Sequence, residues 1–173
     1  PTRRSSDLAE NYALPNGTLA YHTVNGAKSR GVEFDLQGEL ADDWNIYGGV
    51  AHFNLTDATG ERLSAYLPRT TARLFTTYRL PGDWSKLTVG GGVTWQSGTY
   101  QSATNPQGAS VNVEQKSYAL ASLMAKYRAT RNIDLMLTVN NLTDRRYTLM
   151  NGFYNQVVYG APRNIVLTLN YKL

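Results

Sequence analysis

The feature that most constrains the fold is a two-residue alternation of apolar and polar side chains, which recurs along most of the chain. It is clearest at the C-terminal end, where Ile165, Leu167 and Leu169 share one parity and mostly polar residues take the other. Successive side chains of a β-strand point to opposite faces, so this pattern predicts a strand with one apolar and one polar face. The same alternation predicts strands over 32–40 and 133–140 and, more weakly, over 19–25, 44–55, 71–80, 87–100 and 118–128. We therefore predict an all-β, antiparallel, up-and-down protein of about eight strands.

The length and polarity of these segments favour a transmembrane β-barrel. Many are close to the roughly 9–11 residues that cross a bilayer at a tilt, whereas strands of soluble proteins average about five or six. One face of 32–40 carries Glu33, Asp35, Gln37 and Glu39. Burying such groups in an apolar core is costly, so this face must look into water. We expect the apolar face of each strand to contact lipid.

The connections alternate in length, as they do in outer-membrane barrels, which have short turns at one end and long loops at the other. Residues 41–43, 81–85 and 129–131 read as short turns, and 56–69, 101–116 and 144–161 as long loops. Aromatic residues gather near the predicted short-turn end: Trp44, Tyr78, Trp84, Tyr127 and Tyr171. Amphipathic rings favour the headgroup level of a membrane, so we expect these to form a girdle.

Composition excludes several other classes. The 17 Lys and Arg against 13 Asp and Glu give a net charge of +4 that is scattered along the chain, which predicts no nucleic-acid partner. With no cysteine there is no disulfide framework and no thiolate metal site. The two histidines, His22 and His52, have no carboxylate at ligand spacing, and no catalytic constellation is visible. We predict no enzymatic activity, no metal site and no cofactor.

Residues 1–8 are polar and lack the alternation found downstream. We predict that they form a disordered or non-native tail and that 9–173 form the barrel segment.

Four short motifs stand out, at 139–147 (VNNLTDRRY), 159–164 (YGAPRN), 26–33 (GAKSRGVE) and 67–69 (LPR). They resemble motifs of TonB-dependent outer-membrane receptors of the siderophore type. The stretch 139–147 (VNNLTDRRY) resembles their NNL-x-D-[KR]-x-Y signature, and 159–164 (YGAPRN) resembles their closing YG-x-PR segment. Upstream, 26–33 (GAKSRGVE) is similar to their A-x-S-[KR]-G-[VI]-E strand, and 67–69 (LPR) to the [VL]-P-[KR] that follows a long loop. Their order and spacing agree with the family.

The resemblance implies the C-terminal part of a larger barrel whose lumen holds an N-terminal plug that this chain lacks. It implies the outer membrane of a Gram-negative cell, with membrane lipid around the barrel. The receptor would bind a ferric siderophore and import it in a TonB-dependent manner, with TonB acting through the missing N-terminal region. Iron would be present only as part of the chelated ligand.

Candidate ligand contacts are rings and cations of the long loops, because a bulky and often anionic chelate should dock by stacking and charge attraction. They are Tyr66, Tyr100, Phe153, Tyr154, Tyr159, Arg145 and Arg146. The landmark residues of the family motifs are expected to be structural, since Asn and Asp side chains bond nearby backbone at strand exits. They are Asn140, Asn141, Asp144, Tyr147, Gly160, Pro162 and Arg163.

Two alternatives stay open at this point. One is a stand-alone eight-stranded outer-membrane barrel with a structural or adhesive role, which would pair its first strand with its last. The other is a soluble lipocalin-like binder, which would turn its apolar faces inward and its acidic face out to water.

Overall fold

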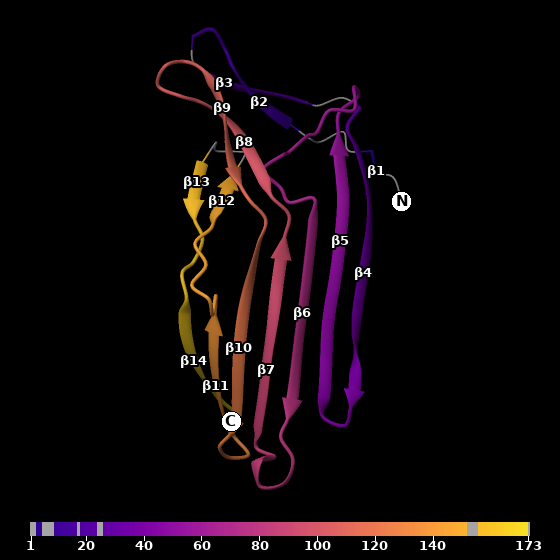
Figure 1. The fold of residues 1–173 in the computed structure, drawn as a ribbon, viewed down its shortest axis with the longest axis vertical. Helices are drawn as coiled ribbons and strands as arrows, with labels where there is room; N and C mark the ends of the chain where they lie inside the picture. Colours follow the sequence, from indigo (N-terminus) through magenta and orange to yellow (C-terminus); the bar gives the residue numbers. More distant parts are fainter. Residues whose placement is uncertain (1–2, 5–8, 17, 24–25, 152–155, 173) are drawn as a thin grey trace.

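An open, curved antiparallel sheet makes up most of the structure, a computed structural model that describes residues 3–4, 9–16, 18–23, 26–151 and 156–172. The order of its strands is β1-β4-β5-β6-β7-β10-β11-β14 (Figure 1). Their bounds are Arg3–Arg4 for β1, Lys28–Ala41 for β4, Trp44–Thr56 for β5, Thr70–Arg79 for β6, Leu87–Gln96 for β7, Tyr118–Arg128 for β10, Ile133–Asn140 for β11 and Asn164–Tyr171 for β14. The all-β, antiparallel character predicted from the sequence is confirmed.

Three two-stranded hairpins lie at the long-loop end of this sheet (Figure 1). They pair β2 with β3, β8 with β9 and β12 with β13. Their bounds are Ala9–Ala13 for β2, Leu19–Thr23 for β3, Thr99–Thr104 for β8, Ser110–Gln115 for β9, Thr148–Asn151 for β12 and Gln156–Tyr159 for β13. The short connections lie at the other end, where a single 3-10 turn, η1 (Gly82–Trp84), joins β6 to β7.

Two predicted strands are corrected. The sequence predicts that 19–25 belongs to the barrel wall, but its strand β3 pairs with β2, because five residues are too short to span the wall and a turn at Pro15 and Asn16 lies just upstream. The predicted strand 87–100 ends at Gln96, and Thr99 already begins the hairpin β8–β9. At this break Thr70 donates its backbone N–H to Ser97 Oγ at 3.1 Å.

The sheet does not close. Within the described part of the chain β14 pairs only with β11, and β4 carries only the two-residue β1 on its other side. The alternative of an eight-stranded barrel closed on itself is therefore wrong for the described residues.

Strand register sorts the side chains into two faces. One cross-strand row runs Phe34, Val50, Ala72 and Trp95, and it is apolar throughout. The next row runs Asp35, Gly49, Arg73 and Thr94. The apolar face is left open: Val32 is 74% exposed and Leu167 is 70% exposed.

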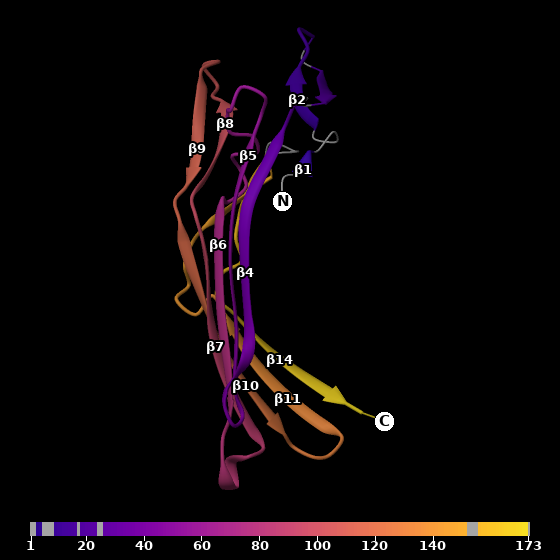
Figure 2. The same cartoon turned by 90° about the vertical axis from the view of Figure 1, so that its right-hand side faces the viewer.

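The polar face is the concave one. In the side view β4 and β14 both lie to one side of β7 and β10, so the sheet is a trough (Figure 2). Glu33 of β4 and Leu149 of the β12–β13 hairpin, which connects β11 to β14 at the far side of the sheet, line one pocket and therefore face each other across the trough. The lipocalin-like alternative required the opposite arrangement and is wrong.

Few side chains are buried, as expected for a wall rather than a globule. Among the described residues the buried ones are Ala27, Leu63, Tyr118, Thr99 and Asn141. All lie toward the long-loop end, where Leu55 packs against Ala27 and Leu63. No helix in the described ranges is long and apolar enough to cross a membrane.

The aromatic side chains expected near the short turns lie there. Trp44 and Tyr78 are cross-strand partners whose rings meet edge to face at 6.4 Å. Tyr171 pairs in register with Ile133 on the same apolar face, and Trp84 of η1 is 67% exposed.

Candidate functional site

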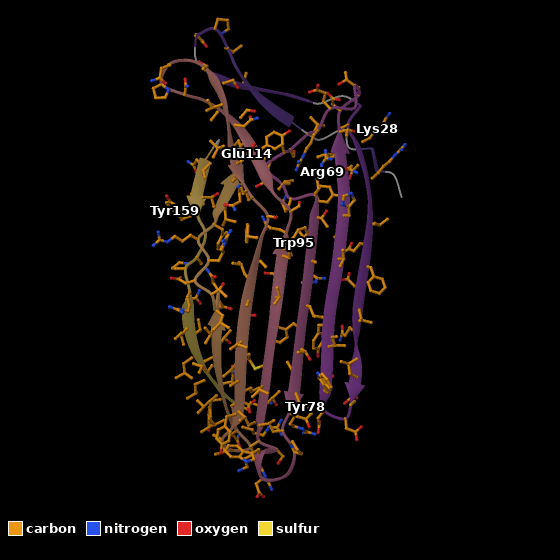
Figure 3. The ribbon with its side chains drawn as sticks, viewed as in Figure 1. Lys28, Arg69, Tyr78, Trp95, Glu114 and Tyr159 are labelled. Carbon is orange, nitrogen blue, oxygen red and sulfur yellow. The ribbon has the colours of Figure 1, made fainter. Side chains whose placement is uncertain are left out.

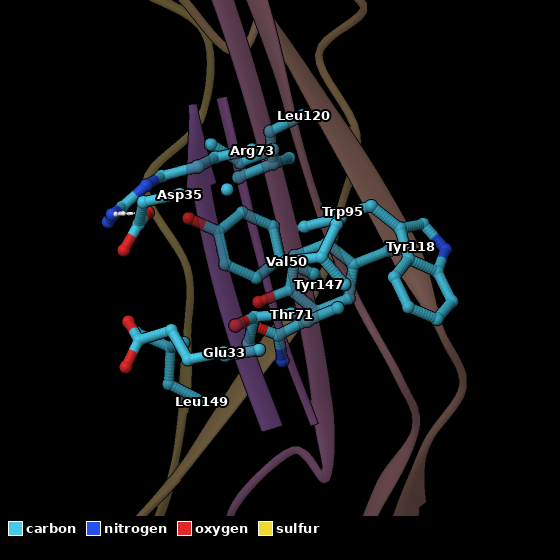
Figure 4. A pocket seen from close by; sticks show the side chains of 15 residues that line it. Glu33, Asp35, Val50, Thr71, Arg73, Trp95, Tyr118, Leu120, Tyr147 and Leu149 are labelled. Atoms are coloured by element: carbon cyan, nitrogen blue, oxygen red, sulfur yellow. Dashed lines mark hydrogen bonds and ion pairs between the residues drawn. The ribbon is translucent and has the colours of Figure 1, made fainter. Parts of the chain in front are cut away.

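A pocket of about 330 Å³ lies on the concave face toward the long-loop end (Figure 4). Strands β4 to β7 supply its acidic and polar wall, including Glu33, Asp35 and Thr71. Tyr118 of β10 and Tyr147, in the segment before β12, contribute rings. The pocket thus combines carboxylates, hydroxyls, one guanidinium and two phenols in a space open to the trough.

Its guanidinium, Arg73, is paired with Asp35 across an intervening strand. Arg73 Nη2 lies 2.8 Å from Asp35 Oδ1, and both side chains are more than half exposed (Figure 4). Gly49 stands between them in register, and a Cβ at Gly49 would collide with the Asp35 carboxylate and crowd Arg73 Nε. The Asp35–Arg73 ion pair therefore requires a glycine at position 49. Solvent screening keeps its contribution to stability small, about 0–1 kcal/mol.

Tyr147 is held against the wall by two neighbours. Its ring lies 4.6 Å from the ring of Tyr118, with 32° between their planes. The second neighbour is Gly160, where an added Cβ would overlap the Tyr147 ring. The backbone N–H of Gly160 also donates to the Tyr147 carbonyl at 2.9 Å. Tyr147 of the motif at 139–147 thus contacts Gly160 of the motif at 159–164.

Asn141 organises the segment that carries Tyr147. It is 5% exposed and adopts a left-handed backbone, φ 49°, which asparagine tolerates better than most residues. Its Nδ2 donates to the carbonyls of Arg145 at 2.9 Å and Ala161 at 3.0 Å, and its Oδ1 accepts from the Arg145 N–H at 2.8 Å. Asn141 therefore ties the start of the loop to its return.

The other motif residues add bonds between the same two segments. Asp144 Oδ1 accepts from the backbone N–H of Arg163 at 2.9 Å. Asn140 Nδ2 donates to Asn164 Oδ1 at 2.9 Å, and Asn164 Nδ2 donates to the Pro162 carbonyl at 3.2 Å. These contacts support the predicted structural role of the motif residues, which stays a prediction.

A second pocket, of about 430 Å³, adjoins the first and shares Tyr147 with it. Arg145, Arg146 and Tyr159 line it together with Gly160 and Pro162. Both arginines are exposed, and Tyr159 is 86% exposed (Figure 3). Three of the predicted ligand contacts are therefore brought together.

The other predicted contacts are placed elsewhere. Tyr66 and Tyr100 are both half-buried. They lie near each other, because the Tyr100 N–H donates to the carbonyl of Ala65 at 3.1 Å. The guanidinium carbon of Arg62 lies 5.4 Å from the centre of the Tyr100 ring. Burial, and secondarily the charge of Arg69, lowers the pKa of Arg62 below its ordinary value. Phe153 and Tyr154 lie outside the described residues.

Sequence reasoning missed Arg73 and Tyr118 as pocket residues. The sequence does not single out Arg73, and its partner depends on strand register, which alternation does not give. No group of three or more metal-ligating side chains occurs in the described ranges.

The comparisons with known proteins agree on one family. A family model described as "TonB dependent receptor-like, beta-barrel" matches residues 3–142. The chain is 42% identical over 173 residues to the ferric-pyoverdine 358 receptor of Pseudomonas putida, covering 97% of this chain and 20% of that protein. It is 35% identical to the ferripyoverdine receptor of Pseudomonas aeruginosa, covering 91% of this chain and 19% of that protein.

A solved structure of a relative supports the same family. The crystal structure of the outer-membrane ferripyoverdine receptor of Pseudomonas aeruginosa, bound to ferripyoverdine, superimposes with a TM-score of 0.81 at 34% identity. The match covers 95% of this chain and 23% of that one. The chain thus spans about a fifth of the length of the relatives that it matches.

Proposed function

The chain belongs to the TonB-dependent receptor family, through the β-barrel domain of those receptors, and from that premise we propose that it forms the C-terminal part of a larger barrel that imports a ferric siderophore of the pyoverdine type. Its place is the outer membrane of a Gram-negative cell.

The sheet edges support the larger barrel. A spanning sheet must satisfy its backbone groups by closing, because the bilayer core supplies no water. The described sheet ends on β14 at one side and on β1 and β4 at the other, so further strands are needed to close it. Its exposed apolar convex face and charged concave face fit a wall between lipid and an aqueous lumen.

The observation that carries the function is the joined pair of pockets at the loop end. The lumen-side pocket offers hydroxyls and phenols, and the neighbouring pocket offers Arg145, Arg146 and Tyr159. Exposed rings and guanidinium groups suit an anionic, partly aromatic chelate. Transport would proceed by binding and conformational change, with TonB as the partner of the whole receptor and no bond made or broken.

The test uses the full-length receptor that carries this chain, in cells that lack other receptors for the same siderophore. Tyr159→Ala and Arg146→Gln should each weaken binding of ferric pyoverdine about two- to tenfold, the loss expected for one stacking or charge contact. Uptake of radiolabelled iron at limiting ligand should fall accordingly. Trp84→Ala is the matched control, because it removes an exposed ring at the opposite end of the wall.

Membrane levels of each variant are compared by immunoblot, so that lost uptake is not lost protein. Wild-type binding in both loop-end variants would remove these residues from the site. Failure of the wild-type receptor to take up any ferric siderophore would refute the transport function itself.

A further inference from the structure

A broad hollow of about 930 Å³ lies on the convex face, away from the pockets described above. It is close to the short-turn end, where Tyr78 lies (Figure 3). Trp44, Tyr78 and Val89 wall it on the turn side, and Leu123 walls it on the side of β10. It therefore interrupts a face that is otherwise covered with apolar side chains.

The hollow exists because one cross-strand row is small at its centre. Thr76, Gly91 and Leu123 are consecutive partners in register. Gly91 has no side chain, and a Cβ there would lie 3.0 Å from Leu123 Cδ2, so even a methyl group would crowd the floor. Gly91 thus adds no side chain to the hollow, and the Leu123 side chain borders the space that is left there.

The indole wall of the hollow is fixed, and its N–H and the neighbouring Thr76 hydroxyl both have hydrogen-bond partners. Trp44 donates its Nε1–H to Thr76 Oγ1 at 2.8 Å, and that hydroxyl donates to the Asn45 carbonyl at 2.8 Å. The edge-to-face contact with Tyr78 holds the indole in place. The surface presented to an occupant is therefore mainly hydrocarbon and aromatic.

One carboxylate stands at the rim. Asp42, in the turn between β4 and β5, lines the hollow and is exposed. Its neighbour Asp43 pairs with Arg79 at 2.5 Å, whereas Asp42 has no ion pair among the described residues. An occupant with an apolar body and a cationic end at the short-turn side would match both features.

We propose that this hollow binds one phospholipid whose head group carries an ammonium ion. An acyl chain lies over Gly91 between the aromatic pair and Leu123, and the ammonium group pairs with Asp42 at the headgroup level. The inference rests on the proposed function, which places the convex face against lipid.

The test is native mass spectrometry of the intact receptor in detergent, titrated with phosphatidylethanolamine and with phosphatidylglycerol of the same acyl chains. The wild-type receptor should bind the first adduct of the ammonium lipid about two- to fivefold more tightly, as for an exposed ion pair. Asp42→Asn should equalise the two lipids. Asp83→Asn, an acid of the neighbouring turn that does not line the hollow, should keep the preference.

Gly91→Leu should weaken both lipids alike, because the added side chain fills the hollow. A preference that survives Asp42→Asn, or binding that is unaltered by Gly91→Leu, would overturn the site. Asp42→Asn changes an exposed turn residue, so the test does not depend on whether Gly91→Leu folds. If the receptor were instead extracted from cells in the absence of detergent, the membrane location would be refuted, and with it both the proposed transport function and the lipid site.

Discussion

The contact between Gly160 and Tyr147 predicts a steric coupling that a double-mutant cycle can measure. Ala at position 160 would place its methyl group in the space that the Tyr147 ring occupies, so the ring must leave its present packing against Tyr118. Overpacking of this kind costs about 1–3 kcal/mol, and loss of the ring pair adds about 0.5–1.5 kcal/mol. In a Tyr147→Ala background the methyl group has room, and Gly160→Ala should cost almost nothing.

The assay is hydrogen exchange in the intact receptor, because the disturbance should be a local opening of the loop rather than unfolding of the wall. The reporting amides are those of residue 160, bonded to the Tyr147 carbonyl at 2.9 Å, and Leu142, bonded to the Ala121 carbonyl at 2.8 Å. Since each 1.4 kcal/mol is a factor of ten, the summed cost of about 1.5–4.5 kcal/mol means that Gly160→Ala should speed exchange there about tenfold to a thousandfold.

Gly38→Ala is the matched control, since no atom lies within 4 Å of a Cβ at that strand position. It should leave exchange at the loop unchanged. The reasoning is refuted if Gly160→Ala accelerates exchange equally with and without the Tyr147 ring, because the cost would then have nothing to do with their contact.

Three further predictions follow from single contacts. Asn141→Ala should destabilise the loop by about 2–4 kcal/mol because its buried hydrogen bonds are lost, and local hydrogen exchange should become faster. Asn141→Gly tolerates the left-handed backbone, so it should regain only part of the lost stability. Gly49→Val should separate Asp35 from its arginine partner and raise the mobility of both side chains in NMR relaxation, with less than about 1 kcal/mol lost from stability. The pKa of Asp57 is lowered, chiefly because the Thr59 side chain donates a hydrogen bond to its carboxylate. The ionised carboxylate therefore stabilises the turn at pH above the unfolded-state pKa of Asp57, and this stabilisation is lost as the pH falls through the lowered pKa of the folded state. In Thr59→Ala, the midpoint of the Asp57 titration followed by NMR should move upward.

The wall was predictable because strand parity is a direct consequence of backbone geometry. Once Ile165 and Leu167 were assigned to one face, the face of every residue in that strand followed, and both are exposed on the convex side. The short turns were predictable for a similar reason, since their residues favour chain reversal locally. Neither inference required knowledge of which strands are neighbours.

The hairpins inside the long loops were missed although their signal was present. The stretch 110–114, SVNVE, alternates as a strand does, but the polar composition of 101–116 favours a loop and hides this signal. The pairing of Asp35 with Arg73 could not be read from sequence, because it spans two strand boundaries and depends on register. The contact of Tyr147 with Gly160 likewise joins two motifs through loop packing.

The two ends of this structure are therefore stabilised by different interactions. The strands need little buried core, because ladder hydrogen bonds and a surrounding bilayer can hold an amphipathic wall. The loop-end pockets have no such support, and their shape depends on polar contacts such as those of Asn141 and on the Tyr147–Gly160 packing. Substitutions at these anchors should thus alter ligand binding while the wall persists, whereas charges placed on the convex face should impair membrane insertion first.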